Sequence, residues 1–186
     1  MILAGGASRR FGAPKGLARL NGTRLVDIVQ TCIRAQTTGP LALNAAADGP
    51  YASLGLRIIP DSHANQPGPL AGLYAAMNWA AELGHEHVVT VPVDLPFLPA
   101  NLVTELHNAG APAIAASAER KHPAAGLWSV SLKGDLDTQI KSGMRAAHAW
   151  VEHCKAAPAH FEPNPDGRDP FFNINTPADL AEASRA

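Results

Sequence analysis

Short apolar segments alternate with segments of helical periodicity along this chain, and no other feature limits the possible folds as strongly. Residues 24–36 carry apolar side chains at intervals of three and four, which is the spacing of one helix face. We expect further helices over residues 70–83, 99–107 and 132–151, the last with a break near Ser142-Gly143, and a final helix capped by Thr176. Short apolar runs flanked by turn residues predict strands over residues 1–3, 41–45, 56–60, 87–93, 113–116 and 125–130. This order predicts an α/β fold with a mostly parallel central sheet and helices on both faces.

Size and charge narrow the class of protein further. The length of 186 residues fits one hydrophobic core, so we expect a single domain over residues 1–186. Hydrophobic residues make up 46% of the chain, which excludes a disordered protein. A net charge of −1 leaves no overall positive field, so neither nucleic acid nor a membrane is an expected partner. Two widely separated cysteines and the lack of a long apolar run indicate a cytoplasmic protein.

The run from Leu3 to Gly16 follows the first expected strand and holds four glycines and three basic residues, with no acidic residue. Glycines let main-chain N–H groups approach a ligand, and arginine and lysine match phosphate oxygens. The run matches neither a P-loop nor the glycine pattern of dinucleotide-binding folds. We interpret it as a polyphosphate-binding loop, in which Lys15 and Arg9 or Arg10 hold a triphosphate, rather than as a turn with solvated cations.

Further motifs follow in a fixed order: Pro60-Asp61, Gly68-Pro69-Leu70-Ala71-Gly72, Asp94-Leu95-Pro96, His122-Pro123 and Asn173-Ile174-Asn175-Thr176-Pro177. Together with the run Leu3–Gly16, this set resembles the molybdenum cofactor guanylyltransferases over the whole length of the chain. The resemblance implies a Rossmann-like nucleotidyltransferase fold that binds GTP with Mg2+, transfers GMP to molybdopterin (the molybdenum cofactor) and releases pyrophosphate. It also implies a set of nucleotide-binding positions: Leu3, Ala4, Gly5, Gly6, Lys15, Asn44, Asp61 and Asp94.

Asp94 directly follows the most apolar expected strand, at the end where a parallel sheet presents side chains to a ligand. A carboxylate there suits Mg2+, which prefers oxygen ligands and neutralises triphosphate charge, so we assign Asp94 as the metal ligand. A helix cap before Pro96 is the alternative interpretation. Asp61 also follows a strand and fits contact with a ribose, a base or a metal-bound water, or alternatively a simple turn.

A second basic group consists of Arg120, Lys121 and His122, which we expect in a loop between two strands. It suits the phosphate of the second substrate, although a solvated loop fits the residues equally well. Asn173 and Asn175 lie two residues apart in an extended stretch, so their side chains face the same way. They fit either the second substrate or the Mg2+ shell.

The chemistry assigns catalytic roles to Lys15, Arg9 and Asp94. A phosphate monoester is largely ionised at pH 7, so its attack on the nucleotide needs positioning and charge stabilisation but no general base. A molybdopterin cytidylyltransferase is the nearest alternative, but that branch commonly carries alanine where this chain has Gly5. A noncatalytic GTP sensor is a second alternative, and it would not need Asp94, Lys15 and the second basic group together. The expected partners besides GTP and molybdopterin are other cofactor-assembly proteins and apo-molybdoenzymes.

Overall fold

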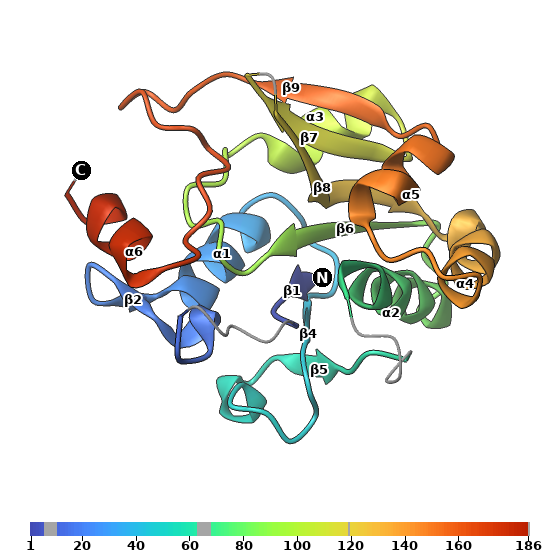
Figure 1. Ribbon diagram of the computed structural model, residues 1–186, viewed down its shortest axis with the longest axis horizontal. Coiled ribbons are helices and arrows are strands. Elements are labelled where there is room, and N and C mark those ends of the chain that lie inside the picture. The colour runs from blue at the N-terminus through green and yellow to red at the C-terminus, as the bar shows by residue number, and fades with distance from the viewer. Residues whose placement is uncertain (6–10, 63–67, 119, 186) are drawn as a thin grey trace.

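A seven-stranded sheet runs through the middle of the molecule, in the order β5-β4-β1-β6-β8-β7-β9 (Figure 1). The computed structural model describes residues 1–5, 11–62, 68–118 and 120–185. The strands are β1 (Ile2–Leu3), β4 (Ala42–Asn44), β5 (Arg57–Ile59), β6 (His87–Pro92), β7 (Ala113–Ser117), β8 (Arg120–Ser129) and β9 (Ala157–Phe161). Strand β8 is antiparallel to its two neighbours, and the other pairs of adjacent strands are parallel. The predicted α/β fold with a mostly parallel sheet is therefore confirmed.

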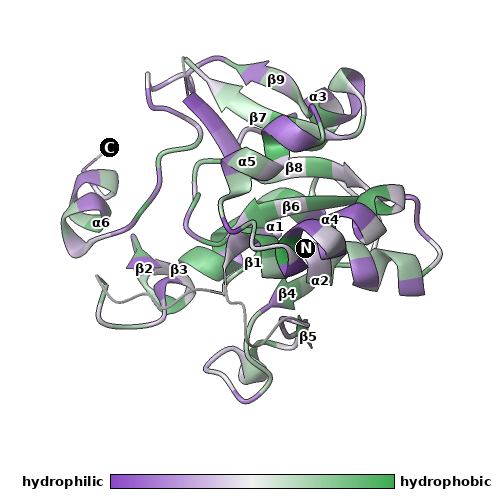
Figure 2. Cartoon of the chain, turned by 45° about the vertical axis from the view of Figure 1, so that its right-hand side comes forward, coloured by the Kyte–Doolittle hydropathy of each residue, from purple (hydrophilic) through white to green (hydrophobic). Residues whose placement is uncertain are grey.

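Helices cover both faces of the sheet. Helices α1 (Leu25–Arg34) and α3 (Leu102–Ala109) pack on one face, and α2 (Pro69–Glu82), α4 (Lys133–Lys141) and α5 (Ala147–His153) pack on the other. Successive side chains of a strand point to opposite faces, so Leu43 joins the first core and Ala42 joins the second. Each buried leucine-sized side chain contributes about 1.5–3 kcal/mol to folding. Figure 2 shows this distribution: β6 and β7 are mostly green, which marks hydrophobic residues, and α4 carries purple, hydrophilic residues.

A third apolar cluster, beside the sheet, joins residues 20–25 to the last part of the chain. It contains Leu20 and Leu25 from the region of the hairpin β2 (Arg19–Leu20) and β3 (Thr23–Arg24), and Ile174 and Ala183 near helix α6 (Pro177–Ala183). Helix α6 begins as predicted, with Thr176 as its cap. The cluster brings the end of the chain next to the loop that follows β1.

The predicted helices are present with small changes at their ends, and the larger differences are the starts of helix α3 and of strand β8. Helix α3 begins at Leu102 rather than near residue 99, because Pro99 opens a turn in which its carbonyl accepts the Leu102 N–H at 3.2 Å. Strand β8 begins at Arg120, so Arg120, Lys121 and His122 lie in a strand and not in the predicted loop. The pairing with β7 shifts register between Ile114 and Ala115, whose partners are Gly126 and His122, and the stretch of β8 between these partners contains Pro123. Proline has no N–H to donate, and a bulge of this kind tolerates it.

Strands β2, β3 and β9 were not predicted from the sequence. The short 3-10 helices Lys15–Leu17, Ala52–Leu54 and Val130–Leu132 complete the elements of the described chain. Among the described residues, no helix is both long enough and apolar enough to cross a membrane.

Candidate active site

The carboxyl ends of β1, β4 and β6 lie side by side and carry most of the predicted site. The chain runs from β1 outward to β4 and β5, then returns through α2 to β6 on the other side of β1. Parallel sheets bind ligands where the direction of winding changes in this way, because the loops diverge and leave a crevice. Two hydrogen bonds fix the end of β1 in this position: Ala4 N donates to Asn44 O at 2.9 Å, and Val93 N donates to Leu3 O at 2.9 Å.

Lys15 and Asp94 contact each other beside the ends of β1 and β6. Lys15 Nζ donates to Asp94 Oδ2 at 2.8 Å and to Asn175 Oδ1 at 2.6 Å. The side chains of Lys15 and Asp94 are 17% and 13% exposed, so this pair is less screened by water than a surface ion pair. Three residues predicted separately from three motifs therefore form one cluster.

The second carboxylate oxygen of Asp94 has no hydrogen-bond donor within the described part of the chain, although it is buried. Buried polar atoms nearly always have a partner, and an ionised oxygen without one is costly. A cation, a water molecule or a ligand hydroxyl beside Oδ1 would satisfy it. The donor chemistry of this oxygen is the kind that Mg2+ prefers.

Asn44 is held in one orientation at the end of β4. Its Nδ2 group donates to Ile59 O at 3.0 Å and to Asp61 Oδ1 at 2.9 Å, so both amide hydrogens are used. The amide oxygen then faces Gly5 and Gly72, where a Cβ would come within 3.2 Å and 2.6 Å of it. Gly5 and Gly72 therefore leave room for the Asn44 side chain beside the end of β1.

A residue that the sequence did not single out supports the main chain next to Lys15. Tyr51 is buried, and its hydroxyl oxygen accepts the Gly16 N–H at 3.1 Å. Burial raises the pKa of this phenol, with a further contribution from the charge of Asp94, so Tyr51 stays neutral. A Cβ at Gly16 would lie 2.8 Å from Val93 and 2.9 Å from Tyr51, so only glycine fits there. A lone tyrosine in a loop gives no sequence signal for this role.

The segment before α6 lies beside Asp94. Ile174 N donates to Asp94 O at 3.0 Å, which places Asn175 directly beside Lys15. Asp179 Oδ2 accepts the N–H groups of Asn175 and Thr176, both at 2.8 Å. The N–H of Asn175, followed by that of Thr176, holds the pKa of Asp179 below its usual value, and the positive charge of Lys15 adds to this.

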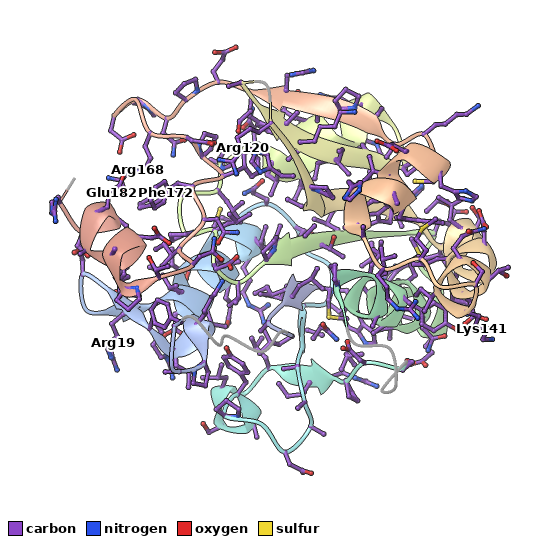
Figure 3. The ribbon with its side chains drawn as sticks, viewed as in Figure 1. Arg19, Arg120, Lys141, Arg168, Phe172 and Glu182 are labelled. Atoms are coloured by element: carbon purple, nitrogen blue, oxygen red, sulfur yellow. The ribbon has the colours of Figure 1, made fainter. Side chains whose placement is uncertain are left out.

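The second basic group lies at the start of β8. Arg120 and Lys121 are exposed, and Figure 3 shows Arg120 on the same side of the molecule as Phe172. His122 is half-buried: its Nε2 lies 2.8 Å from Ser117 Oγ, and its ring stacks on Phe171 with centroids 4.5 Å apart. Burial lowers the pKa of this imidazole, so it is mostly neutral at neutral pH.

The stack of His122 on Phe171 joins the second basic group to the segment that carries the two asparagines. Asn173 is exposed two residues after Phe171, and Asn175 reaches Lys15. The structure thus connects the two predicted halves of the site through residues 171–175. Gly6 and Arg9, which the sequence assigns to the nucleotide, lie outside the described residues.

Arg168 is a second residue that the sequence did not indicate. Its guanidinium lies 4.1 Å from the centre of the Phe97 ring, and Nη1 donates to Ala183 O at 3.1 Å (Figure 3). The side chain therefore ties the segment after β9 both to the end of α6 and to the loop after Asp94.

The chain is similar to known proteins over its whole length. The family model described as "MobA-like NTP transferase domain" matches residues 1–157. A molybdenum cofactor guanylyltransferase from Rhizobium leguminosarum bv. trifolii is 43% identical over 194 residues, covering 100% of this chain and 90% of the relative. A protein of the same name from Nitrobacter hamburgensis is 37% identical over 195 residues, covering 100% of this chain and 92% of the relative.

Solved structures share the fold. The crystal structure of molybdopterin-guanine dinucleotide biosynthesis protein A from Archaeoglobus fulgidus gives a TM-score of 0.74 at 21% identity, covering 98% of this chain and 95% of that chain. The 2-C-methyl-D-erythritol 4-phosphate cytidylyltransferase from Thermus thermophilus gives a TM-score of 0.67 at 16% identity, with 98% and 95% coverage. At these identities the likeness concerns the fold alone.

Proposed function

Because this chain belongs to the MobA-like NTP transferase family, we propose that it transfers GMP from GTP to the terminal phosphate of molybdopterin, forming the guanine dinucleotide cofactor and releasing pyrophosphate. The observation that carries the proposal is the contact between Lys15 and Asp94 beside the carboxyl ends of β1 and β6. It brings a cation suited to phosphate and a carboxylate suited to a metal ion within 2.8 Å of each other, in a chain related to guanylyltransferases over its full length.

GTP binds, in this proposal, against the end of β1. The main chain at Leu3, Ala4, Gly5 and Gly6, together with Asn44 and Asp61, binds the nucleoside. Lys15 and Arg9 bind the triphosphate, because their positive charges match its phosphate oxygens. Gly5 and Gly72 leave room for the Asn44 side chain at this edge, which supports its place beside the proposed nucleoside site.

Asp94 is the residue that would hold Mg2+, and its buried, unpartnered Oδ1 supports this assignment. Bound there, the ion would neutralise part of the triphosphate charge. Asp94 Oδ2 meanwhile orients Lys15, so the same carboxylate serves two partners.

Molybdopterin binds, in this proposal, on the side of the second basic group. Arg120 and Lys121 are exposed at the surface and would bind its phosphate, while His122 stacks on Phe171, two residues before the exposed Asn173. An oxygen of the terminal phosphate forms a bond to the α-phosphorus of GTP. The bond from that phosphorus to the oxygen bridging to the β-phosphorus breaks, and pyrophosphate leaves with the electron pair. Lys15 stabilises the charge that develops on the departing pyrophosphate.

The compartment we propose is the cytoplasm. Cys32 and Cys154 are free thiols, as expected for a protein that works under reducing conditions.

The test is to incubate the protein with molybdopterin, Mg2+ and each nucleoside triphosphate in turn, following pyrophosphate and the mass of the product. We expect a guanine dinucleotide from GTP and little product from CTP. Comparable turnover of CTP would indicate a cytidylyltransferase instead. GTP binding without any transfer would indicate a sensor.

A further inference from the structure

We propose that Asp179 is a positioning residue of this site, because it fixes the main chain of Asn175 and thereby the contact of Asn175 Oδ1 with Lys15 Nζ. The inference rests on the proposed function, since it assigns Lys15 to the triphosphate. Asp179 itself lies on α6 and makes its hydrogen bonds to the main chain rather than to the site.

The Lys15 side chain is held in one position by two oxygen atoms. A lysine side chain has four rotatable bonds, and without contacts it would sample many positions. Here Nζ is fixed between two oxygens, Asp94 Oδ2 at 2.8 Å and Asn175 Oδ1 at 2.6 Å. Asn175 is therefore part of what aims the ammonium group, even though 160 residues separate it from Lys15.

The main chain of Asn175 is held by Asp179. It lies in an irregular segment, so no regular strand or helix fixes its main chain. Asp179 Oδ2 accepts the N–H of Asn175 and that of Thr176, each at 2.8 Å, while Asp179 N donates to Thr176 Oγ1 at 3.1 Å. An ordinary capping box involves only the cap residue, here Thr176. The additional bond to Asn175 extends the cap by one residue, to the residue that contacts Lys15.

The negative charge of Asp179 strengthens its hold on the main chain of Asn175. Asp94 and Asp179 approach the region of Lys15 from two sides, the end of β6 and the start of α6. The N–H of Asn175 is the main cause that lowers the pKa of Asp179, and the positive charge of Lys15 adds to it. A hydrogen bond to an ionised acceptor is stronger than one to a neutral acceptor. The carboxylate of Asp179 is thus well suited to hold the Asn175 main chain while Lys15 binds the triphosphate.

The experiment compares Asp179→Ala with Ala178→Gly. Ala178 is an exposed neighbour on α6, and glycine there weakens the helix without touching any hydrogen bond of the site. Both variants should show similar small losses in thermal stability. We expect Asp179→Ala to lower kcat/KM for GTP about tenfold, the effect of losing a charged hydrogen bond, and Ala178→Gly to leave it unchanged. Asp179→Glu, which keeps a carboxylate in a Thr-x-x-Glu cap, should restore most of the activity.

A second measurement does not depend on turnover. Brief treatment with an acetylating reagent, followed by mass spectrometry, reports how well each lysine is protected. Lys15 is 17% exposed, and Lys141, 68% exposed and at the opposite end of the molecule from Arg168, is the internal reference (Figure 3). We expect Asp179→Ala to increase Lys15 acetylation relative to Lys141 about fivefold, as loss of one hydrogen bond would, and Ala178→Gly to have no such effect.

The two measurements separate failure of the proposal from failure of the proposed function. Equal acetylation of Lys15 in both variants, or equal loss of kcat/KM, would overturn the role of Asp179 and leave only a helix cap. If the wild-type protein transferred no GMP, the proposed function would be wrong. If Lys15 were still acetylated more readily in Asp179→Ala than in Ala178→Gly, the positioning role would nevertheless stand.

Discussion

Gly72 packs against Asn44 so closely that a Cβ at position 72 would stand 2.6 Å from Asn44 Oδ1. The glycine lies near the start of α2, where its absence of a side chain costs helix stability relative to alanine. Asn44 cannot move away easily, because it is 2% exposed and its amide group is bonded to Ile59 O and Asp61 Oδ1. This pair therefore couples the packing of a helix to the orientation of a side chain in the proposed nucleotide site.

Gly72→Ala should destabilise the protein by about 1–3 kcal/mol, because the added methyl group overpacks a rigid neighbour. It should also weaken GTP binding by displacing Asn44. Chemical denaturation and calorimetric GTP titration measure the two effects. The matched control is Gly134→Ala, in an exposed part of α4 with open space around it, which should stabilise the protein by about 0.5–1 kcal/mol. A Gly72→Ala protein as stable as wild type would contradict the argument.

Asp94→Asn should abolish most of the turnover while the fold stays intact. The amide is a poor Mg2+ ligand and carries no charge to pair with Lys15. We therefore expect kcat to fall about 100-fold or more, which is the usual effect of removing a main electrostatic stabilisation of the transition state. The melting temperature should change by only a few degrees, roughly the effect of 1 kcal/mol in a domain of this size. Turnover near the wild-type rate in saturating Mg2+ would make Asp94 a structural residue only.

Lys15→Ala and Lys121→Ala should separate the two substrates. Lys15→Ala should weaken GTP binding and lower kcat, because it removes a charge from the triphosphate and leaves Asp94 without its partner. Lys121→Ala should raise KM for molybdopterin and leave GTP affinity unchanged, with a loss of about 1–3 kcal/mol for a charged hydrogen bond. Calorimetric titration of each variant with GTP measures whether its GTP affinity has changed. An equal loss of GTP affinity in both variants would mean that both lysines serve the nucleotide.

The sequence predicted well those elements that bury a regular pattern. Helix α1 follows from the spacing of its apolar side chains and strand β6 from its run of apolar residues, so each is specified by its own local sequence. The sequence does not predict strand β9, because this short segment contains Pro158 and the exposed His160. It is an edge strand that exists through pairing with β7, and proline is tolerated at such an edge. Pairing of this kind depends on the tertiary fold, which local propensity does not report.

The same distinction holds for the candidate site. Lys15 and Asp94 were predicted individually, because each lies in a motif directly after a strand. Their contact with Asn175, and the supporting roles of Tyr51 and Asp179, depend on which loops the topology brings together. A tyrosine in a loop and an aspartate in the first turn of a helix each have an ordinary local explanation. Only the structure relates them to Lys15.

His122 gives a prediction on pH. Burial lowers the pKa of its imidazole from the ordinary value of 6.5, while Asp169 raises it and Arg120 lowers it to a smaller extent. As the pH falls, the unfolded chain therefore takes up a proton at this residue at a higher pH than the folded protein does. The contribution of neutral His122 to stability is fully present above about pH 6.5 and is lost progressively as the pH falls below that value.

His122→Gln removes the titrating group and keeps an amide that can reach Ser117 Oγ, which lies 2.8 Å from His122 Nε2. We expect the variant to be less stable than wild type at pH 7.5, because it loses the stack on Phe171. The difference in free energy of unfolding should shrink at pH 5.5, because the wild-type protein alone loses the contribution of neutral His122. Urea denaturation of both proteins at the two pH values measures this difference. A difference that stays constant between pH 7.5 and 5.5 would show that His122 has the same pKa in the folded and unfolded states, so that its burial against Phe171 does not disfavour the charged form.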